Sequence, residues 1–234
     1  MSALRTVAGS GSLVEHAVRR VREHIRTRDL KVGDTLPGEG QFAAELGVSK
    51  AVMREAFGAL AALKVLDVAN GRRARVGAID GSVMGASIDH AVATAQVSVA
   101  EVWDVRRTLE LRTAQLAATQ RSQTQAGEIA RAADAMEAAG DALEEVTRHD
   151  ISFHQAIARA SGNGLFVQII RSFEPLMTVA VPTAWRTRVT PEQREGILRQ
   201  HHLIADAIHR SDPEAAAQAM TDHFDASIGD LFAR

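Results

Sequence analysis

Residues 34–57 read DTLPGEGQFAAELGVSKAVMREAF, and this stretch decides the fold of the first part of the chain. A short helix is predicted over 39–46, and Gly47 then supplies a turn residue that can adopt a positive φ. Ser49 is suited to cap a second helix over 49–63, because its side-chain oxygen can accept hydrogen bonds from the free N–H groups of the first turn. Two short helices around a tight turn predict a helix-turn-helix. We expect its shared core to contain Ala43, Val48, Met53, Phe57 and Leu60.

The start of the second of these helices is expected to face outward. With the apolar side chains in the core, the outward positions are Ser49, Lys50, Ala51 and Arg54. In a helix-turn-helix this end of the second helix enters the major groove of DNA. These four residues are therefore candidate DNA contacts.

A basic hairpin is predicted directly after the helix-turn-helix. Residues 65–76 read VLDVANGRRARV, in which an Asn-Gly pair lies between two short strand-like runs. The expected tip carries two arginines, which suit DNA phosphates or a minor groove. A basic hairpin in this position is a wing. It adds four candidate DNA contacts, Asn70, Gly71, Arg72 and Arg73.

The charge of the 234-residue chain is divided unevenly, although its formal net charge is only −2. Residues 1–77 hold 13 Lys and Arg against 8 Asp and Glu, whereas residues 78–234 hold 14 against 21. This division predicts that only the first part meets a polyanion such as DNA. The chain has no cysteine and no apolar run of the roughly 18 residues that a membrane helix needs. We therefore expect a cytoplasmic protein without disulfides, thiolate metal sites or a membrane partner.

The rest of the chain predicts a mainly α fold, because strand-favouring runs are almost confined to the wing. We expect a winged helix-turn-helix domain over 1–77, a linker with room for one short helix over 78–97, and an all-α antiparallel helical bundle over 98–234 that also dimerises. Apolar spacing predicts one buried helical stripe through Val102, Val105, Leu109 and Leu116. Helices are predicted at about 12–28, 39–46, 49–63, 82–94, 98–120, 123–139, 141–161, 163–182, 191–211 and 213–232.

Four residues of the predicted bundle have the spacing of a metal site. Asp150 and His154 are four apart on one helix and so share a face. His201 and His223 lie 22 residues apart on two successive helices, which a hairpin would bring side by side. Three neutral imidazoles with one carboxylate suit a divalent transition metal such as zinc or nickel. The neighbouring histidines at 149 and 202 are rotated by about 100° on their helices and are not expected to take part.

The first part of the chain resembles the GntR family of regulators over roughly residues 12–77. The resemblance lies in DTLPGE at 34–39, LGVSK at 46–50 and MREAF at 53–57. It implies DNA contacts from Ser49, Lys50 and Arg54, and from 70–72 at the wing. The chain departs from the family pattern at Gly40, where relatives often place a basic residue, and at Lys50, where arginine is commoner.

The second part resembles the FCD domain, which is the ligand-binding partner of FadR-type GntR regulators. The resemblance lies in DISFHQ at 150–155, ASGN at 160–163 and the later pair His201 and His223, and it covers about 98–230. It implies a metal held by Asp150, His154, His201 and His223, with a small carboxylate as effector. Three further residues are implied as effector contacts: Arg106, in a segment similar to the family pattern, Trp185, expected in a loop, and Asn163.

Together these features predict a DNA-binding transcriptional regulator rather than an enzyme. We expect a homodimeric repressor that leaves a palindromic double-stranded operator when a sugar acid, hydroxy acid or dicarboxylate binds the metal site. Two other interpretations stay open from the residues. One is a metal-dependent enzyme that uses the His/Asp site, although the chain has no H-E-x-x-H and no G-x-S-x-G motif. The other is an architectural module that binds DNA without sequence preference.

Overall fold

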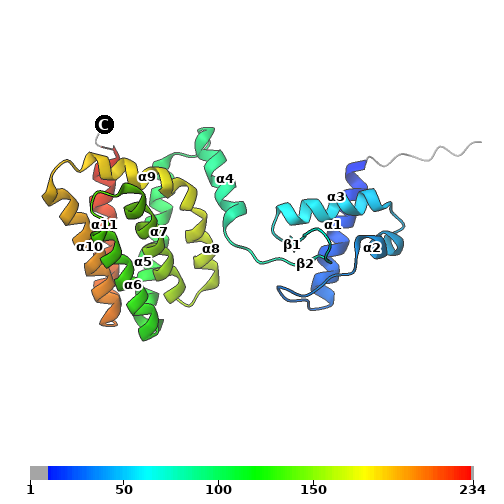
Figure 1. The fold of residues 1–234 in the computed structure, drawn as a ribbon, viewed down its shortest axis with the longest axis horizontal. Helices are drawn as coiled ribbons and strands as arrows, with labels where there is room; N and C mark the ends of the chain where they lie inside the picture. The colour runs from blue at the N-terminus through cyan, green and yellow to red at the C-terminus, as the bar shows by residue number, and fades with distance from the viewer. Residues whose placement is uncertain (1–9, 233–234) are drawn as a thin grey trace, which may run out of the picture. The chain divides into compact units, whose positions relative to one another are not determined.

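The computed structural model describes the chain from residue 10 to residue 232. Contacts within the chain divide it into two compact units, Met1–Val83 and Met84–Arg234. Figure 1 shows that the chain is helical nearly throughout, with one short strand pair in the first unit. The predicted mainly α fold is confirmed.

The described residues of the first unit form three helices and a two-stranded antiparallel sheet ahead of α4 (Ser82–Ala93). Its core joins Val21 of the first helix to Phe42 and Phe57, whose rings meet edge to face at 5.9 Å. Leu36 and Leu60 are also fully buried there. The elements are α1 (Ser10–Thr27), α2 (Glu39–Leu46), α3 (Lys50–Ala62), β1 (Leu66–Asp67) and β2 (Arg75–Val76).

The turn between α2 and α3 has the predicted chemistry. Gly47 ends α2 with φ of 66°, a conformation that glycine adopts without a steric penalty. The backbone N–H of Val52 donates to Ser49 Oγ at 3.2 Å, so this serine caps α3. Met53 is fully buried and Val48 is half-buried against the same core. The predicted helix-turn-helix is therefore present.

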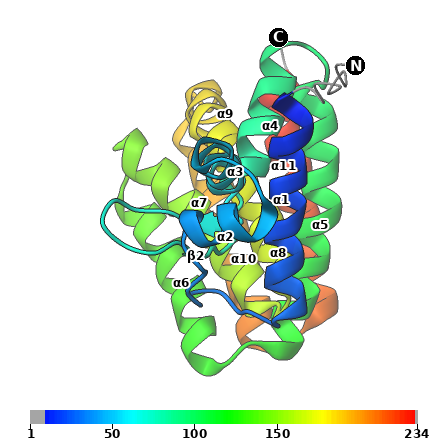
Figure 2. The same cartoon turned by 90° about the vertical axis from the view of Figure 1, so that its right-hand side faces the viewer.

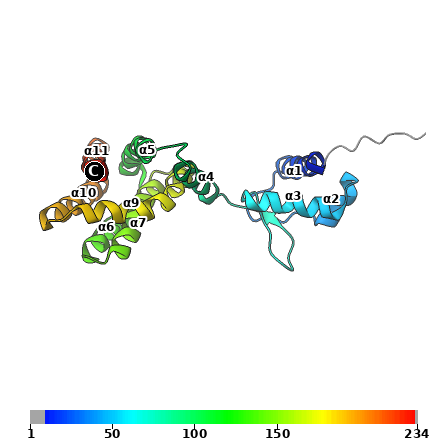
Figure 3. The same ribbon diagram turned by 90° about the horizontal axis from the view of Figure 1, so that it is seen from above.

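The wing is a hairpin with a short ladder and a long tip, visible in Figure 3 as the loop that leaves the helices of this unit. Leu66 pairs with Val76 and Asp67 with Arg75. Gly71 has φ of 76° and lies in a turn at the tip, where the backbone N–H of Arg72 donates to the carbonyl oxygen of Ala69. Thr35 bridges to Arg75 on the other side, so the segment before α2 extends the sheet.

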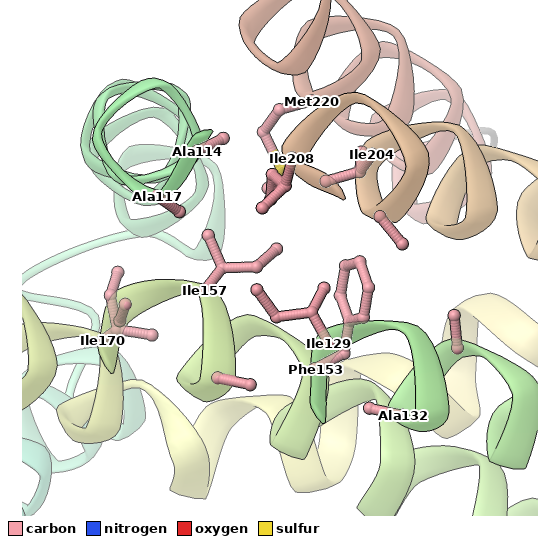
Figure 4. Packing of buried hydrophobic residues seen from close by; sticks show 14 of the residues in the cluster. Ala114, Ala117, Ile129, Ala132, Phe153, Ile157, Ile170, Ile204, Ile208 and Met220 are labelled. Carbon is pink, nitrogen blue, oxygen red and sulfur yellow. The ribbon is translucent and has the colours of Figure 1, made fainter. Parts of the chain in front are cut away.

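The second unit is a helical bundle, in which most helices run along roughly one direction in Figure 2, whereas α9 lies across one end of them in Figure 1. The core of the bundle is shown in Figure 4, where Ile129, Phe153, Ile157, Ile204 and Ile208 meet between facing helices. The elements are α4 (Ser82–Ala93), α5 (Val99–Gln120), α6 (Gln123–Ala138), α7 (Leu143–Ala160), α8 (Gly164–Ser172), α9 (Glu174–Thr187), α10 (Pro191–His209) and α11 (Pro213–Phe232).

The buried face of α5 differs from the predicted stripe. Val102 is buried, but Val105 is 51% exposed, and the buried face runs instead through Arg106, Glu110 and Thr113. The prediction was wrong at Val105, although Val102 is buried and Leu109 packs against the core. It followed apolar residues only, whereas this helix also turns polar side chains toward the interior. Small alanines after them, such as Ala117, let the neighbouring helices pack closely.

The single helix predicted over 163–182 is two helices. It breaks at Phe173, and the parts α8 and α9 are bent by 56°. Pro175 lies in the first turn of α9, where its missing N–H costs little. The chain then continues in helical form past Pro182, because the turn beyond it buries Ala184 and Trp185.

Among the residues that the structure describes, no single helix is long and apolar enough to cross a membrane. The bent pair of α8 and α9 meets the criteria of length and composition only when the two are taken together.

Candidate DNA-binding surface and metal centre

The start of α3 presents an exposed polar surface. Ser49, Lys50 and Ala51 are all exposed, and the Arg54 side chain is 78% exposed. Nε of Arg54 lies 3.8 Å from Glu39 Oε2, a loose surface contact that leaves the guanidinium free to reach a phosphate or a base. Helix N-termini also carry partial positive charge, which favours phosphate.

The wing tip adds a second basic exposed surface. Asn70, Gly71, Arg72 and Arg73 are all exposed. Nη2 of Arg72 lies 2.7 Å from Asp67 Oδ2, so this arginine is held near the strand. The structure thus exposes each of the eight predicted DNA contacts, four at the start of α3 and four in the wing.

Three histidines meet in the interior of the second unit. His154 comes from α7, His201 from α10 and His223 from α11, and all three are buried. One ligand atom from each lies within 4.8 Å of those from the other two. In the tetrahedral geometry that zinc prefers, donors at about 2.1 Å from the ion lie about 3.4 Å apart, so the three side chains would close in around a bound ion.

Hydrogen bonds at the outer edge of the rings orient two of these imidazoles. Nδ1 of His201 lies 2.8 Å from the carbonyl oxygen of Ile197, and Nδ1 of His154 contacts Glu110 Oε2. Both partners only accept hydrogen bonds, so in a neutral ring the proton sits on Nδ1 and the lone pair on Nε2. This arrangement is typical of metal-binding histidines.

The inner edge of the cluster supports a cation. Asp150 Oδ1 lies 3.2 Å from His201 Nε2 and 4.0 Å from His154 Nε2. A carboxylate oxygen and two ring nitrogens would then face one another with lone pairs, which requires a proton or a metal ion between them. Nδ1 of His223 is buried and has no hydrogen-bond partner among the described residues. A divalent ion therefore fits the donor set.

The charge states of the cluster agree with this chemistry. In the metal-free cluster a proton between Asp150 and His201 takes the place of an ion. Burial alone would raise the pKa of Asp150, but this hydrogen bond with His201 and the charges of the nearby imidazoles hold that pKa well below its ordinary value. Burial also lowers the pKa of His223 well below 6.5, and the neighbouring histidines add to the effect. An ionised carboxylate and a neutral imidazole are the forms that bind a metal.

Arg106 lies beside the cluster, as its assignment to the effector site requires. Its Nε donates to Glu110 Oε1 at 2.7 Å, its Nη1 contacts the Met177 sulfur, and its guanidinium lies 5.0 Å from the Trp103 ring centroid. Arg106 lines a cavity of about 30 Å³ together with Asp150, His154 and His223. Such a volume holds about one water molecule, so in this conformation there is room for an ion but not for an organic acid.

Two of the predicted effector residues lie elsewhere. Trp185 is not in a loop but on α9, buried in the core, and it does not line the cavity. Asn163 is exposed and caps α8, accepting from the backbone N–H of Leu165 at 3.0 Å. Its side chain accepts a hydrogen bond at the start of α8 and does not line the cavity.

Two residues of the cavity region were missed by sequence reasoning. Glu110 joins the arginine to a histidine, and Arg188 lines the cavity from the end of α9. The four-residue spacing of Arg106 and Glu110 was a usable signal for the first. Nothing local marks Arg188, because it reaches the cavity only through the path of α9.

Residues 13–76 match the family of bacterial regulatory proteins described as the gntR family, and residues 101–226 match the FCD domain. The chain belongs to the GntR family.

Relatives of this GntR-family protein are transcriptional regulators. It is 32% identical over 200 residues to the Glc operon transcriptional activator of Escherichia coli K12, covering 83% of this chain and 79% of the relative. It is 27% identical over 219 residues to the transcriptional repressor NanR of the same species, covering 92% and 82%. It is thus a DNA-binding transcriptional regulator with an FCD domain.

The fold agrees with a solved member of the family. A GntR protein of Streptococcus agalactiae superposes with a TM-score of 0.66 at 24% identity, covering 91% of this chain and 97% of that one. At this identity the likeness establishes the fold alone.

Proposed function

We propose that this regulator is a repressor that binds a small carboxylate at a divalent metal ion, zinc or nickel, and then releases its operator. The observation that carries the proposal is the convergence of three histidines and Asp150 next to the buried Arg106. Four protein ligands on an ion that accepts more leave room for an incoming carboxylate or hydroxyl. A guanidinium beside the ion would bind the second oxygen of that group.

Three classes of effector meet these requirements: sugar acids, hydroxy acids and dicarboxylates. All supply a carboxylate with a second oxygen donor close by, which suits a metal flanked by an arginine. The two named relatives are an activator and a repressor, so the sign of regulation is part of the proposal. A two-fold homodimer would present two α3 helices to a palindromic operator.

Effector binding must enlarge the cavity, because about 30 Å³ is too small for such an acid. Helix α9 supplies one wall of the cavity through Ala180, Val181 and Ala184. These side chains are small, and the helix contains a proline that removes one backbone hydrogen bond. We therefore assign the movement to α9, since its displacement would break fewer contacts than a displacement of the helices that carry the metal ligands.

A displacement of α9 would reach α4, the helix that follows the DNA-binding unit in the chain. A Cβ atom added at Gly85 of α4 would lie 2.9 Å from the backbone oxygen of Ser172, at the junction of α8 and α9. No side chain separates the two backbones at this point, so a shift of the junction acts directly on α4. An effector with different affinity for the two arrangements would then alter DNA binding.

The test uses the full chain and DNA from upstream of its own gene. The protein is stripped with a chelator, reloaded with zinc or nickel, and titrated with each class of acid while DNA binding is followed by fluorescence anisotropy. We expect one ion per chain and release of DNA only from the metal-loaded form. Equal behaviour of stripped and loaded protein with every acid would contradict the proposal.

A matched pair of variants separates the metal site from histidine content in general. His223→Gln removes a buried ligand, whereas His209→Gln changes an exposed histidine outside the cluster. We expect the first to lose the ion and the response to acids while still binding DNA, and the second to keep all three properties. If both variants responded normally, the cluster would not be the effector site.

A further inference from the structure

Glu110 occupies a position that the proposed function does not by itself explain. It lies on α5, is 1% exposed, and uses both carboxylate oxygens. Oε1 accepts from Nε of Arg106 at 2.7 Å, and Oε2 contacts Nδ1 of His154 on α7. One side chain thus connects the arginine assigned to the effector with a histidine assigned to the metal.

The contact with His154 decides which ring nitrogen carries the proton. A carboxylate oxygen only accepts hydrogen bonds, so the proton of the neutral ring must sit on Nδ1. The lone pair is then on Nε2, the nitrogen that lies 4.0 Å from Asp150 in the cluster. The opposite tautomer would point an N–H into the cluster and prevent metal binding.

The contact with Arg106 gives the same carboxylate a second task. The guanidinium is buried against Trp103 and Phe224, with its centre 5.0 and 5.5 Å from their ring centroids. A buried guanidinium needs a compensating negative charge, and Glu110 supplies it through the Nε edge. Arg106 also lines the cavity, where a carboxylate ligand would bind.

We propose that Glu110 is a positioning residue that fixes the metal-binding tautomer of His154 and holds Arg106 at the cavity, so that metal and carboxylate binding are linked through one side chain. The linkage to metal and effector rests on the proposed function. This linkage is reciprocal. A ligand that binds Arg106 changes the affinity for the ion by the same factor by which the ion changes the affinity for the ligand.

The first test needs neither a metal nor a variant of Glu110. Metal-free protein is labelled with ¹⁵N-histidine, and long-range ¹⁵N–¹H spectra report which nitrogen of each ring is protonated, with His154→Gln used for assignment. We expect the His154 proton on Nδ1. A proton on Nε2 would overturn the positioning role, whatever the protein does with metals.

The second test replaces the carboxylate by an amide of the same shape. In Glu110→Gln the charged Arg106 claims the amide oxygen, so the amide N–H₂ faces His154 and moves the ring proton to Nε2. We expect zinc affinity, measured by competition with a chromophoric chelator, to fall by about 10- to 100-fold. The control Glu137→Gln alters a carboxylate that lies 3.0 Å from Nε2 of the half-buried His202, outside the cluster, and should leave zinc affinity unchanged.

A rescue experiment distinguishes positioning from a general loss of structure. In Arg106→Met with Glu110→Gln no guanidinium competes for the amide oxygen, which can turn to His154 and restore the proton to Nδ1. We expect zinc affinity to return to within a few-fold of wild type, although the response to acids is lost. A double variant that binds zinc as weakly as Glu110→Gln would overturn the proposal.

A failure to fold and a failure of the proposed metal function can each be told apart from a failure of the positioning role. Glu110→Gln could fail to fold because the charge of Arg106 is left buried. In that case the double variant Arg106→Met with Glu110→Gln is compared with a second double variant, Arg106→Met with Glu110→Met. The second one offers His154 no acceptor and should bind zinc at least about tenfold more weakly than the first. If wild-type protein binds no zinc while His154 carries its proton on Nδ1, the proposed metal function fails and the tautomer assignment stands.

Discussion

The two candidate sites of this regulator are built in opposite ways. The DNA-binding surface is exposed and comes from residues close in sequence, at the start of α3 and in the wing. The candidate metal centre is buried and would take its donors from α7, α10 and α11, with supporting contacts from α5. Changes at the first should therefore act mainly on DNA binding, except at Ser49, which also caps α3, whereas changes near the second should act on stability and metal binding together.

The largest expected effect is at Phe153, which tests this difference directly. Its fully buried ring lies 5.0 Å from the His201 ring and 5.5 Å from the His154 ring. Phe153→Ala should lower the free energy of unfolding of the second unit by about 3–5 kcal/mol and weaken metal binding as well. Hydrogen exchange resolved along the chain would show faster exchange in α7 and α10 and little change in α1 to α3.

A control for this change is Val179→Ala on α9, where the side chain is 69% exposed. It should alter stability by less than about 0.5 kcal/mol. Equal acceleration of exchange in both units after Phe153→Ala would show that they unfold as one body, and would remove the basis of the comparison.

The same difference explains which parts of the fold could be predicted. Gly47 and Ser49 act on their own neighbours, so the turn and the start of α3 could be placed from the sequence. Prolines were harder, because Pro175 begins a helix and Pro182 lies within it. The difference between them is set by what the following turn buries, which is a tertiary property. For that reason α9 and the place of Trp185 were mispredicted.

The histidine cluster could be predicted in part. The spacing of Asp150 and His154 on one helix, and of His201 and His223 across a hairpin, could be read from the sequence because helix geometry fixes it. The partners that orient the cluster could not be found this way. Glu110 meets His154 across 44 residues, through the packing of α5 on α7.

A smaller effect is expected at Arg54, on the exposed side of the comparison. Arg54→Ala should weaken binding to an operator fragment by about 1–3 kcal/mol, since it removes a candidate contact to a base edge or a phosphate. Anisotropy titrations at fixed salt measure this loss, and zinc affinity should stay the same. The matched change Arg148→Ala, at an exposed arginine of the second unit, should leave DNA affinity unaltered. Loss of zinc from Arg54→Ala would contradict the separation of the sites.

The smallest effect is expected at Ser49, which is both a helix cap and a candidate DNA contact. Its hydroxyl caps α3 and also lies among the candidate DNA contacts. Ser49→Ala should lower the stability of the first unit by about 1 kcal/mol through loss of the cap, whereas Ser49→Asp keeps a capping oxygen and should preserve stability. The added negative charge would nevertheless repel phosphate, so Ser49→Asp should bind DNA more weakly than Ser49→Ala. If DNA affinity instead followed stability across the two variants, Ser49 would act only as a cap.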